Sequence, residues 1–425
     1  MYLVTIQVPI FVSGPDRFLT TDWKRSLLLL RDSFNGRFGR IQVVAPRLDA
    51  AKVKTDQALE VVHAADEIDL FPSFPEDTRA REFWRTHLYT WRRDVAALLP
   101  SADVVHSGMC DVFRPIAYTG FLMGLQANKP TVFVQDTDQV LQMTELTVHA
   151  TPRQRAKQLA YCYLYERGTR FGVARAGLSL LKGKALQDRY GRYAKNTKNF
   201  HDTSYLTSEI VPQQRIQARV ADLLAAERPI RLVYCGRFEA RKGLSDSIAA
   251  VAQARAQGAR VTFDIIGDGA ERAALEQAVQ RSGVADAVRF LGRRAYGPQL
   301  LADLGEYDAL LFTPTAEDTP RMIFDGYAAG LPLLGYAIEY VRERDSEDRT
   351  VRSVPPRDVA GLASLLCELD RDRGQLAKLA ERAHEAALFH AADAWYKRRA
   401  EWTYEAVAAH RAERAQVAHP GAVRS

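Results

Sequence analysis

The chain has 425 residues, of which 47% are hydrophobic and 26% are charged. These fractions are ordinary for a globular protein and argue against a disordered or fibrous chain. The length exceeds what a single hydrophobic core usually supports, so we expect two domains. The net charge of +6 and the pI of 9.0 favour anionic partners, namely nucleotide sugars, anionic lipid surfaces or nucleic acid, without choosing among them.

The cysteines are few and far apart, with no C-x-x-C pair: Cys110, Cys162, Cys235 and Cys367. This spacing argues against a disulfide framework and a zinc site, and it is typical of a reducing compartment. Residues 1–5 lack the cationic segment of a signal peptide, and no apolar run approaches the ~18 residues of a membrane span. We therefore expect a cytoplasmic protein.

The first half of the chain alternates apolar runs with amphipathic helical patterns. We expect strands at residues 3–11, 41–45, 104–107, 131–135 and 178–182. We expect helices at residues 22–34, 82–99 and 115–127. This alternation predicts an α/β domain with a parallel sheet covered by helices on both faces.

The helix at residues 82–99 carries an apolar stripe at spacings of three and four residues: Trp84, Leu88, Trp91, Val95 and Leu98. Such a stripe favours packing against the sheet over contact with a membrane. A further helix is expected at residues 209–227, and we place the hinge between the two domains near residues 200–230. A final aromatic-rich helix is expected at residues 391–410.

The second half contains apolar runs at residues 231–235, 261–266, 288–292 and 308–313, which predict further buried parallel strands. The first of these runs ends at Gly236, where a missing side chain lets a ligand approach the backbone. Arg237 and Lys242 then place two cations at the mouth of the following helix, a pairing suited to a diphosphate. The alternative is two solvated cations in an arginine-rich chain. Gly267 and Asp268 open the next helix, a turn that is weak by itself.

Two carboxylates follow the run at residues 308–313. Glu317 is expected on the loop after the strand, and Asp325 one and a half turns into a helix that Thr319 would cap. Both would lie at the crevice where open α/β sheets bind ligands. The alternative is an i,i+4 surface pair of Arg321 with Asp325 and a solvated Glu317.

These segments, in this order, resemble the nucleotide-binding half of GT-B glycosyltransferases, specifically the retaining family-4 type. The resemblance covers residues 231–382 and implies two Rossmann-like domains that face an interdomain cleft, with a C-terminal helix crossing back to the first domain. The expected boundaries are an acceptor domain at 1–205, a nucleotide-sugar domain at 206–385, the crossing helix at 386–411 and a disordered tail at 412–425.

The resemblance also implies roles for individual residues. Arg237 and Lys242 would carry the diphosphate of the donor, and the pair Glu317 and Asp325 would carry the donor sugar and the ribose hydroxyls. The backbone and side chains of Gly236, Gly267, Asp268 and Thr319 are expected to line the same site. This sequence departs from the family at position 325, where Asp replaces the usual Glu, and at residues 318–321, where Asp-Thr-Pro-Arg replaces the common Gly-Phe-Gly type. The Thr-Pro-Arg form resembles a branch acting on cell-surface polysaccharides.

Two further positions have open interpretations. His106 matches the first histidine of a family element and would lie near the donor sugar; a structural histidine at a strand end is equally compatible with the sequence. Asp136 and Asp138 resemble the metal-binding Asp-x-Asp of the other large glycosyltransferase fold, but a turn-and-cap role is favoured. We therefore expect no metal site and no cofactor beyond the nucleotide-sugar co-substrate.

The leading interpretation is a glycosyltransferase that moves a sugar, with retention, from a nucleoside diphosphate to a glycan or lipid-linked acceptor. The alternatives are a sugar-nucleotide epimerase or hydrolase of the same architecture, an inactive regulatory or scaffolding protein, and, on pI alone, a nucleic-acid-binding protein. No nucleic-acid-binding motif is visible, so no nucleic-acid partner is expected. Residues 153–175 mix arginines and a lysine with Tyr161, Tyr163 and Tyr165, which suits contact with an anionic membrane surface; an ordinary helix with a solvated basic face is the alternative.

Overall fold

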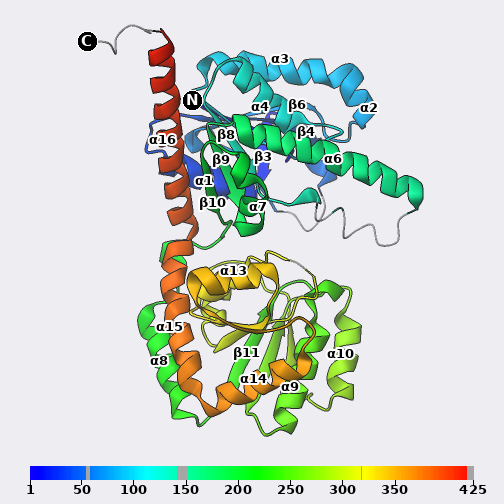
Figure 1. Cartoon of the computed structure of the whole chain (residues 1–425), viewed down its shortest axis with the longest axis vertical. Coiled ribbons are helices and arrows are strands. Elements are labelled where there is room, and N and C mark those ends of the chain that lie inside the picture. Colours follow the sequence, from blue (N-terminus) through cyan, green and yellow to red (C-terminus); the bar gives the residue numbers. More distant parts are fainter. Residues whose placement is uncertain (54–57, 141–142, 144–150, 317, 419–425) are drawn as a thin grey trace. The chain divides into compact units, whose positions relative to one another are not determined.

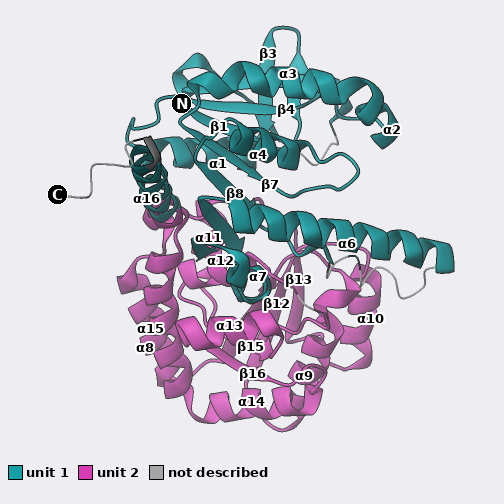
Figure 2. Cartoon of the chain, turned by 45° about the horizontal axis from the view of Figure 1, so that its top comes forward, with its two compact units in different colours: residues 1–200, 396–425 teal, residues 201–395 magenta. Residues whose placement is uncertain are grey.

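The computed structural model describes residues 1–53, 58–140, 143, 151–316 and 318–418. The chain forms two compact units (Figures 1 and 2). Unit 1 contains residues 1–200 together with 396–425, and unit 2 contains residues 201–395. Within the described residues, every helix is too short or too polar to cross a lipid bilayer.

Unit 2 is built on a parallel six-stranded sheet with the order β13-β12-β11-β14-β15-β16. The strands are β11 (Ile230–Cys235), β12 (Val261–Ile266), β13 (Val288–Gly292), β14 (Ala309–Phe312), β15 (Leu333–Tyr336) and β16 (Val351–Val354). The helices are α8 (Gln213–Ala225), α9 (Leu244–Ala256), α10 (Arg272–Arg281), α11 (Pro298–Leu304), α12 (Met322–Ala328), α13 (Glu339–Asp348), α14 (Val359–Arg371) and α15 (Arg373–His390). The strand order reverses between β11 and β14, which is the point where doubly wound sheets bind ligands.

Unit 1 repeats this topology. The parallel strands are β1 (Tyr2–Thr5), β4 (Ile41–Asp49), β6 (Ile68–Pro75), β7 (Val104–Gly108), β8 (Thr131–Gln135), β9 (Leu178–Lys182) and β10 (Thr197–Phe200). The main helices are α1 (Thr21–Ser33), α2 (Ala80–Glu82), α3 (Leu88–Leu98), α4 (Ile116–Gln126), α6 (Pro152–Arg175) and α7 (Gly183–Tyr190). The sheet order is β10-β9-β8-β7-β1-β4, with β6 also paired to β4, so the order reverses between β1 and β7. The predicted architecture of two Rossmann-like domains is confirmed.

The single strand predicted at residues 3–11 is wrong, because the chain leaves the sheet between Thr5 and Ile10. β1 pairs with the first part of the long strand β4, and β2 (Ile10–Ser13) pairs with the last part, with Ile10 opposite Arg47. Pro9 has no N–H to donate to a neighbouring strand, which is consistent with the break. β2 then forms a hairpin with β3 (Asp16–Thr20), which pairs in turn with β5 (Leu59–Val61).

The apolar stripe at residues 82–99 is only partly buried, because the helix is interrupted. A π-helical turn, Phe83–His87, separates α2 from α3. A π turn holds one residue more than an α turn, so it rotates the side chains that precede it relative to those that follow. Phe83, Trp91 and Val95 are buried as a result, whereas Trp84 is 52% exposed. The prediction that Trp84 packs against the sheet is therefore wrong.

The last helix, α16 (Ala392–Ala418), begins in unit 2 and continues in unit 1 from Tyr396. Within unit 1, the Tyr404 hydroxyl donates a hydrogen bond of 2.7 Å to the carbonyl of Phe34. The helix predicted at 391–410 is present, and the range 386–411 assigned to the crossing helix is divided between the end of α15 and α16. The chain is helical through Ala418, where the sequence had suggested a disordered tail from residue 412, and residues 419–425 lie outside the described part of the chain.

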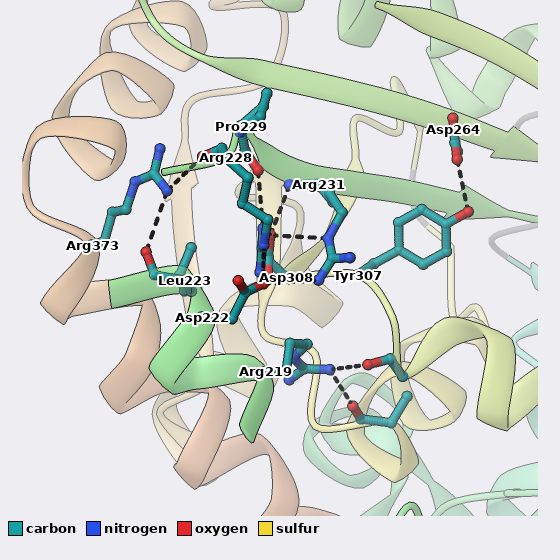
Figure 3. Close-up of polar contacts among 12 residues, drawn as sticks. Arg219, Asp222, Leu223, Arg228, Pro229, Arg231, Asp264, Tyr307, Asp308 and Arg373 are labelled. Carbon is teal, nitrogen blue, oxygen red and sulfur yellow. Dashed lines mark hydrogen bonds and ion pairs between the residues drawn. The ribbon is translucent and has the colours of Figure 1, made fainter. Parts of the chain in front are cut away.

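A network of arginines closes the amino-terminal edge of the unit 2 sheet (Figure 3). The carboxylate of Asp308, which directly precedes β14, receives hydrogen bonds from Arg228 at 2.6 and 2.9 Å and from the backbone N–H of Arg231 at 2.8 Å. Arg219 of α8 donates to the carbonyls of Ala329 and Gly330 at 2.9 and 2.7 Å. These charges hold α8 and the strands together at the edge opposite to the candidate site.

Candidate donor site at the carboxyl edge of unit 2

Glycine backbone forms the floor of the site. The N–H of Gly236 donates to Ile266 at 2.9 Å, and the N–H of Gly267 donates to Gly292 at 2.8 Å. These bonds extend the pairing of β11, β12 and β13 past the strand ends. Gly267 has φ +139°, and a Cβ there would lie 1.9 Å from the carbonyl oxygen of Gly236. A residue with a side chain would not fit this position without a shift of the neighbouring backbone.

The loop after β11 carries the predicted cations in different environments. The Arg237 side chain is 79% exposed and lies 3.2 Å from Glu239. Its carbonyl accepts a 3.0 Å hydrogen bond from the Tyr234 hydroxyl, whose pKa burial raises. Lys242 is buried, with a relative exposure of 9%. The structure thus brings both cations into one loop, with Arg237 open to solvent and Lys242 enclosed.

The loops after β11 and β14 are bonded to each other. Gly243 has φ +65°, and a Cβ there would lie 1.9 Å from the carbonyl oxygen of Thr313. The hydroxyl of Thr313 donates to the Gly243 carbonyl at 2.8 Å, and the N–H of Thr315 donates to the Arg241 carbonyl at 2.9 Å. The two strand exits that flank the topological switch point therefore form one continuous surface.

Asp318 is the residue that the sequence did not single out for this site. Its carboxylate forms an ion pair with Lys242 and a second one, of 3.0 Å, with Arg241. The only hint in the sequence was the acid at a position where the family has glycine. Glu317, the neighbouring predicted site residue, lies outside the described residues.

Asp325 lies on α12 and is half-buried beside the end of β11. The hydroxyl of Tyr296 donates to its Oδ1 at 3.3 Å. Burial raises the pKa of Asp325 to about 7, although the positive charge of Arg321 and the hydrogen bond from Tyr296 act in the opposite direction. Arg321 itself donates to the hydroxyl of Ser204 at 2.9 Å, and the contacts of the described residues include no ion pair between Arg321 and Asp325. The alternative interpretation, an i,i+4 surface ion pair between Arg321 and Asp325, is therefore not observed among the described residues.

Thr319 does not cap a helix. α12 begins at Met322, its N-cap is Arg321, and no side chain caps it. Thr319 is exposed in an irregular segment, so the prediction of a helix start at this residue is wrong. The carbonyl of Pro320 accepts only a long bond, of 3.4 Å, from Ile323. Pro320 and Arg321 therefore separate Thr319 from the first helical residue, Met322.

Asp268 closes the turn after β12. Its carbonyl accepts a 3.0 Å hydrogen bond from the N–H of Phe238, which ties the turn to the cationic loop. Its carboxylate accepts from its neighbour Gly269 and lies 3.8 Å from both Arg272 and Arg293. These contacts place Asp268 at the same edge of the sheet as the other candidate residues.

His106 lies in unit 1, on the strand beside the switch point of that sheet. Its Nδ1 and the hydroxyl of Tyr2 share a hydrogen bond of 2.8 Å. Burial, together with the nearby charge of Arg399, lowers the pKa of His106 to about 3. The imidazole is therefore neutral at physiological pH and serves as a hydrogen-bonding partner within the core of unit 1.

The Asp-x-Asp segment has contacts that fit a turn. Asp138 accepts a hydrogen bond of 3.1 Å from the N–H of Val140, as in a capped turn. Asp138 also forms an ion pair of 2.9 Å with Arg189, which in turn pairs with Glu166 at 2.9 Å. A cationic side chain already neutralises the carboxylate that a divalent ion would require.

Unit 2 also contains a buried cluster of charged residues that was not predicted from the sequence. Arg344 of α13 has no exposed side-chain surface, and its guanidinium donates to Glu343 at 2.7 Å and to Glu347 at 2.6 Å, and lies 3.0 Å from His201. His201, Glu343 and Glu347 are close enough together to ligate a metal ion. The Arg344 guanidinium contacts all three of these groups, so an internal cation already offsets part of the negative charge.

The chain is similar in sequence to known glycosyltransferases over the part of unit 2 that carries the candidate donor site. Residues 229–372 match the family model described as "Glycosyl transferases group 1". Over 136 residues, the chain is 35% identical to a glycogen synthase of Mycobacterium tuberculosis, a match that covers 32% of this chain and 33% of that protein. It is 28% identical over 222 residues to the alpha-D-kanosaminyltransferase of Streptomyces kanamyceticus, which covers 50% and 56% of the two chains. The chain thus spans about a third of the length of the first of these relatives.

Solved structures match along nearly the whole chain. HepE of Anabaena superposes with a TM-score of 0.63 and 17% sequence identity, covering 95% of this chain and 100% of HepE. WaaG, a glycosyltransferase involved in lipopolysaccharide biosynthesis, superposes with a TM-score of 0.58 and 15% identity, covering 94% and 99%. The family-model match lies in unit 2, and the structural match extends the likeness to unit 1. The chain therefore has the GT-B fold of these structures, and its residues 229–372 are similar to a group 1 glycosyltransferase domain.

Proposed function

We propose that this protein transfers a sugar from a nucleoside diphosphate sugar to an acceptor hydroxyl. The observation that carries the proposal is the joining of two loops at the switch point of unit 2. One loop supplies Arg237 and Lys242, the other leads to Asp325, and hydrogen bonds between Thr313, Gly243 and Arg241 hold them together. Cations on one side and a carboxylate on the other match the two ends of a nucleoside diphosphate, its phosphates and its ribose hydroxyls.

The chemistry requires stabilisation of a departing diphosphate and of positive charge on the sugar. Arg237 and Lys242 provide fixed positive charge, and α9, which begins directly after Gly243, directs its N-terminal dipole toward the same loop. The absence of a side chain at Gly267, which is half-buried, would let the phosphates approach the backbone. Glu317, by its resemblance to the family, would hold hydroxyls of the donor sugar and so orient the reacting carbon. We propose retention of configuration and independence from metal ions on the same resemblance.

We assign the acceptor to unit 1 and propose that it is presented at an anionic membrane surface. The support is α6, which begins with a capping box between Thr151 and Gln154. Its first two turns are exposed almost throughout. The exposed basic residues of α6 are Arg153, Arg155, Lys157, Arg167, Arg170 and Arg175, and the exposed apolar residues are Leu159, Tyr163, Leu164 and Phe171. Tyr161 and Tyr165, which the sequence suggested for this surface, are buried in the core of unit 1.

A panel of nucleoside diphosphates in a thermal-shift assay tests the proposed function. A ligand that binds only the folded protein raises its melting temperature, by an amount equivalent to about 2.7 kcal/mol at a hundredfold excess over Kd. The HepE structures contain UDP or UDP-glucose, which makes UDP the first member of the panel. Stabilisation by one nucleoside diphosphate, and turnover of the corresponding sugar donor, is the expected result. A folded protein that none of them stabilises would refute the assignment, and binding without turnover would favour an inactive, ligand-sensing protein.

A further inference from the structure

The phosphate-binding cations of the candidate site are already neutralised by an internal anion. Asp318 contacts Lys242 and lies 3.0 Å from Arg241, and its side chain is only 13% exposed. Glu239 pairs in the same way with Arg237 at 3.2 Å and with Arg241 at 2.9 Å. Of these two acids, Asp318 is the one that contacts the buried lysine.

A carboxylate and a phosphate oxygen use a lysine ammonium in the same way. Each forms short charge-assisted hydrogen bonds with it, and two such anions at one ammonium repel each other. A diphosphate that binds Lys242 must therefore replace the Asp318 carboxylate or share the ammonium with it at a cost in free energy. Asp318 lies between the end of β14 at Phe312 and the start of α12 at Met322, outside regular secondary structure. It can change partner without breaking the pairing of the sheet.

We propose that Asp318 is a positioning residue that occupies the phosphate site in the absence of donor and is displaced from Lys242 when a nucleoside diphosphate binds. This inference rests on the proposed function and adds a property to the same site. Before binding, Asp318 holds Lys242 and Arg241 in place. During binding it competes with the ligand, so a single phosphate group is a poor occupant and a diphosphate, which also reaches Arg237, is favoured. After the reaction, its return to Lys242 assists release of the diphosphate product.

Calorimetric titration of the full chain with inorganic pyrophosphate tests this inference. The variant Asp318→Asn keeps the shape of the side chain and removes its charge. We expect it to bind pyrophosphate ~10-fold more tightly than the wild type, because one competing charge-assisted contact is removed. Asp318→Ala should change the affinity in the same direction, although without the amide to support Lys242. Loss of a purely structural side chain would instead weaken binding.

The matched control is Asp286→Asn, which changes the net charge equally. Asp286 is exposed, pairs with Arg255 at 2.5 Å and lies before β13, at the other edge of the sheet. The affinity of the Asp286→Asn variant for pyrophosphate should equal that of the wild type. Unchanged or weaker binding by both Asp318 variants, with wild-type melting temperatures, overturns the inference. These results distinguish the two proposals. If the wild type binds nucleoside diphosphates but the Asp318 variants bind pyrophosphate no better than it does, only the role of Asp318 is refuted. If the folded wild type and the folded variants bind no diphosphate, the proposed function is refuted.

Discussion

The hydroxyl of Tyr296 donates a 3.3 Å hydrogen bond to Oδ1 of Asp325, and so connects the segment after β13 to α12. Asp325 is thereby held beside the end of β11, where its charge adds to the effect of burial in raising the pKa of the Cys235 thiol to about 12. A carboxylate in this environment has a pKa of about 7, because burial disfavours its charged form. The protonation state of the proposed ribose contact therefore changes near neutral pH.

Nucleotide binding should depend on this titration. An ionised Asp325 accepts hydrogen bonds from both ribose hydroxyls, so the affinity for a nucleoside diphosphate is expected to rise as the pH increases through about 7. The variant Asp325→Asn should bind more weakly above pH 8 and should lose the pH dependence. Calorimetric titration with the best nucleoside diphosphate between pH 5.5 and 8.5 measures both effects. A wild-type profile that is flat over this range would contradict the prediction.

The same titration affects stability, with a defined sign. The folded-state pKa of Asp325 lies above its unfolded value, so the folded protein binds this proton more tightly than the unfolded chain does. Protonation of Asp325 therefore adds to the free energy of unfolding at low pH, and this contribution is lost as the pH rises to about 7. Asp325→Asn has no charge to bury. At ~1.4 kcal/mol per pKa unit, discounted because the side chain is only half-buried, the variant should gain ~2 kcal/mol of unfolding free energy over the wild type at pH 8 and about none at pH 4. Urea denaturation at the two pH values provides the measurement.

Arg237→Ala should reduce turnover by on the order of a hundredfold or more, because the charge on the leaving diphosphate grows in the transition state. Arg237 is exposed, so the fold should not change. Arg281→Ala, at the exposed end of α10, is the matched control and should retain wild-type rates. Wild-type turnover in Arg237→Ala would remove this residue from the diphosphate site.

Gly267→Ala should damage the site without a change of charge. The new Cβ would meet the Gly236 carbonyl at 1.9 Å in a backbone conformation that only glycine adopts easily. We expect a destabilisation of ~1–3 kcal/mol and a loss of nucleotide binding. Gly258→Ala also places a side chain at positive φ, but in open space, and it reports the backbone strain alone. Equal nucleotide binding by both variants would argue against close approach of a ligand at Gly267.

Catalysis should proceed without a divalent ion, since cationic side chains and a helix dipole face the proposed phosphates. Exhaustive chelation followed by donor turnover is the measurement, and activity should remain near the untreated rate. Complete loss that manganese or magnesium restores would revive Asp136 and Asp138 as candidate ligands.

The exposed face of α6 should bind anionic vesicles at low salt, with each lysine or arginine near the surface contributing ~1 kcal/mol. The double variant Arg153→Glu with Lys157→Glu should lower co-sedimentation with phosphatidylserine vesicles severalfold. Arg85→Glu with Arg92→Glu makes the same change of charge on exposed residues before and within α3. Similar losses in the two double variants would indicate attraction by net charge alone, and no sedimentation of the wild type would refute the membrane proposal.

Most of the strands that the sequence predicted are present, because buried parallel strands are continuous apolar runs, and β12 and β13 have the predicted bounds. The sequence did not predict β6, β10, β15 or β16. It failed where a local pattern is compatible with more than one geometry. The run from Leu3 to Phe11 is mostly apolar, yet the chain leaves the sheet before Pro9 and rejoins it farther along β4. Trp84 has helical spacing from Trp91, but the intervening π turn rotates it to the surface.

In the candidate site too, the features that depend on residues adjacent in sequence were predictable, and those that depend on the tertiary fold were not. Glycines and cations after β11 are adjacent in sequence, so their proximity could be predicted. The pairing of Lys242 with Asp318 joins residues 76 positions apart and depends on the packing of one loop on the other. The burial of Arg344 among His201, Glu343 and Glu347 depends on the tertiary fold in the same way. Charged residues in a helix such as α13 look solvated in sequence, because nothing local marks which of them the fold encloses.

The path of α16 has a consequence for how the protein is made. Residues 396–418 belong to unit 1 but are synthesised after all of unit 2. Until they leave the ribosome, the ring surface of Phe34 and Phe38 lacks its partner Tyr404, which lies 6.1 and 5.2 Å from the two rings in the finished protein. All residues of unit 2 are synthesised before unit 1 is complete, because unit 1 includes the second part of the last helix. A translation product that stops before Tyr396 would therefore carry a complete unit 2 attached to an unfinished unit 1, with an apolar surface that chaperones and proteases recognise.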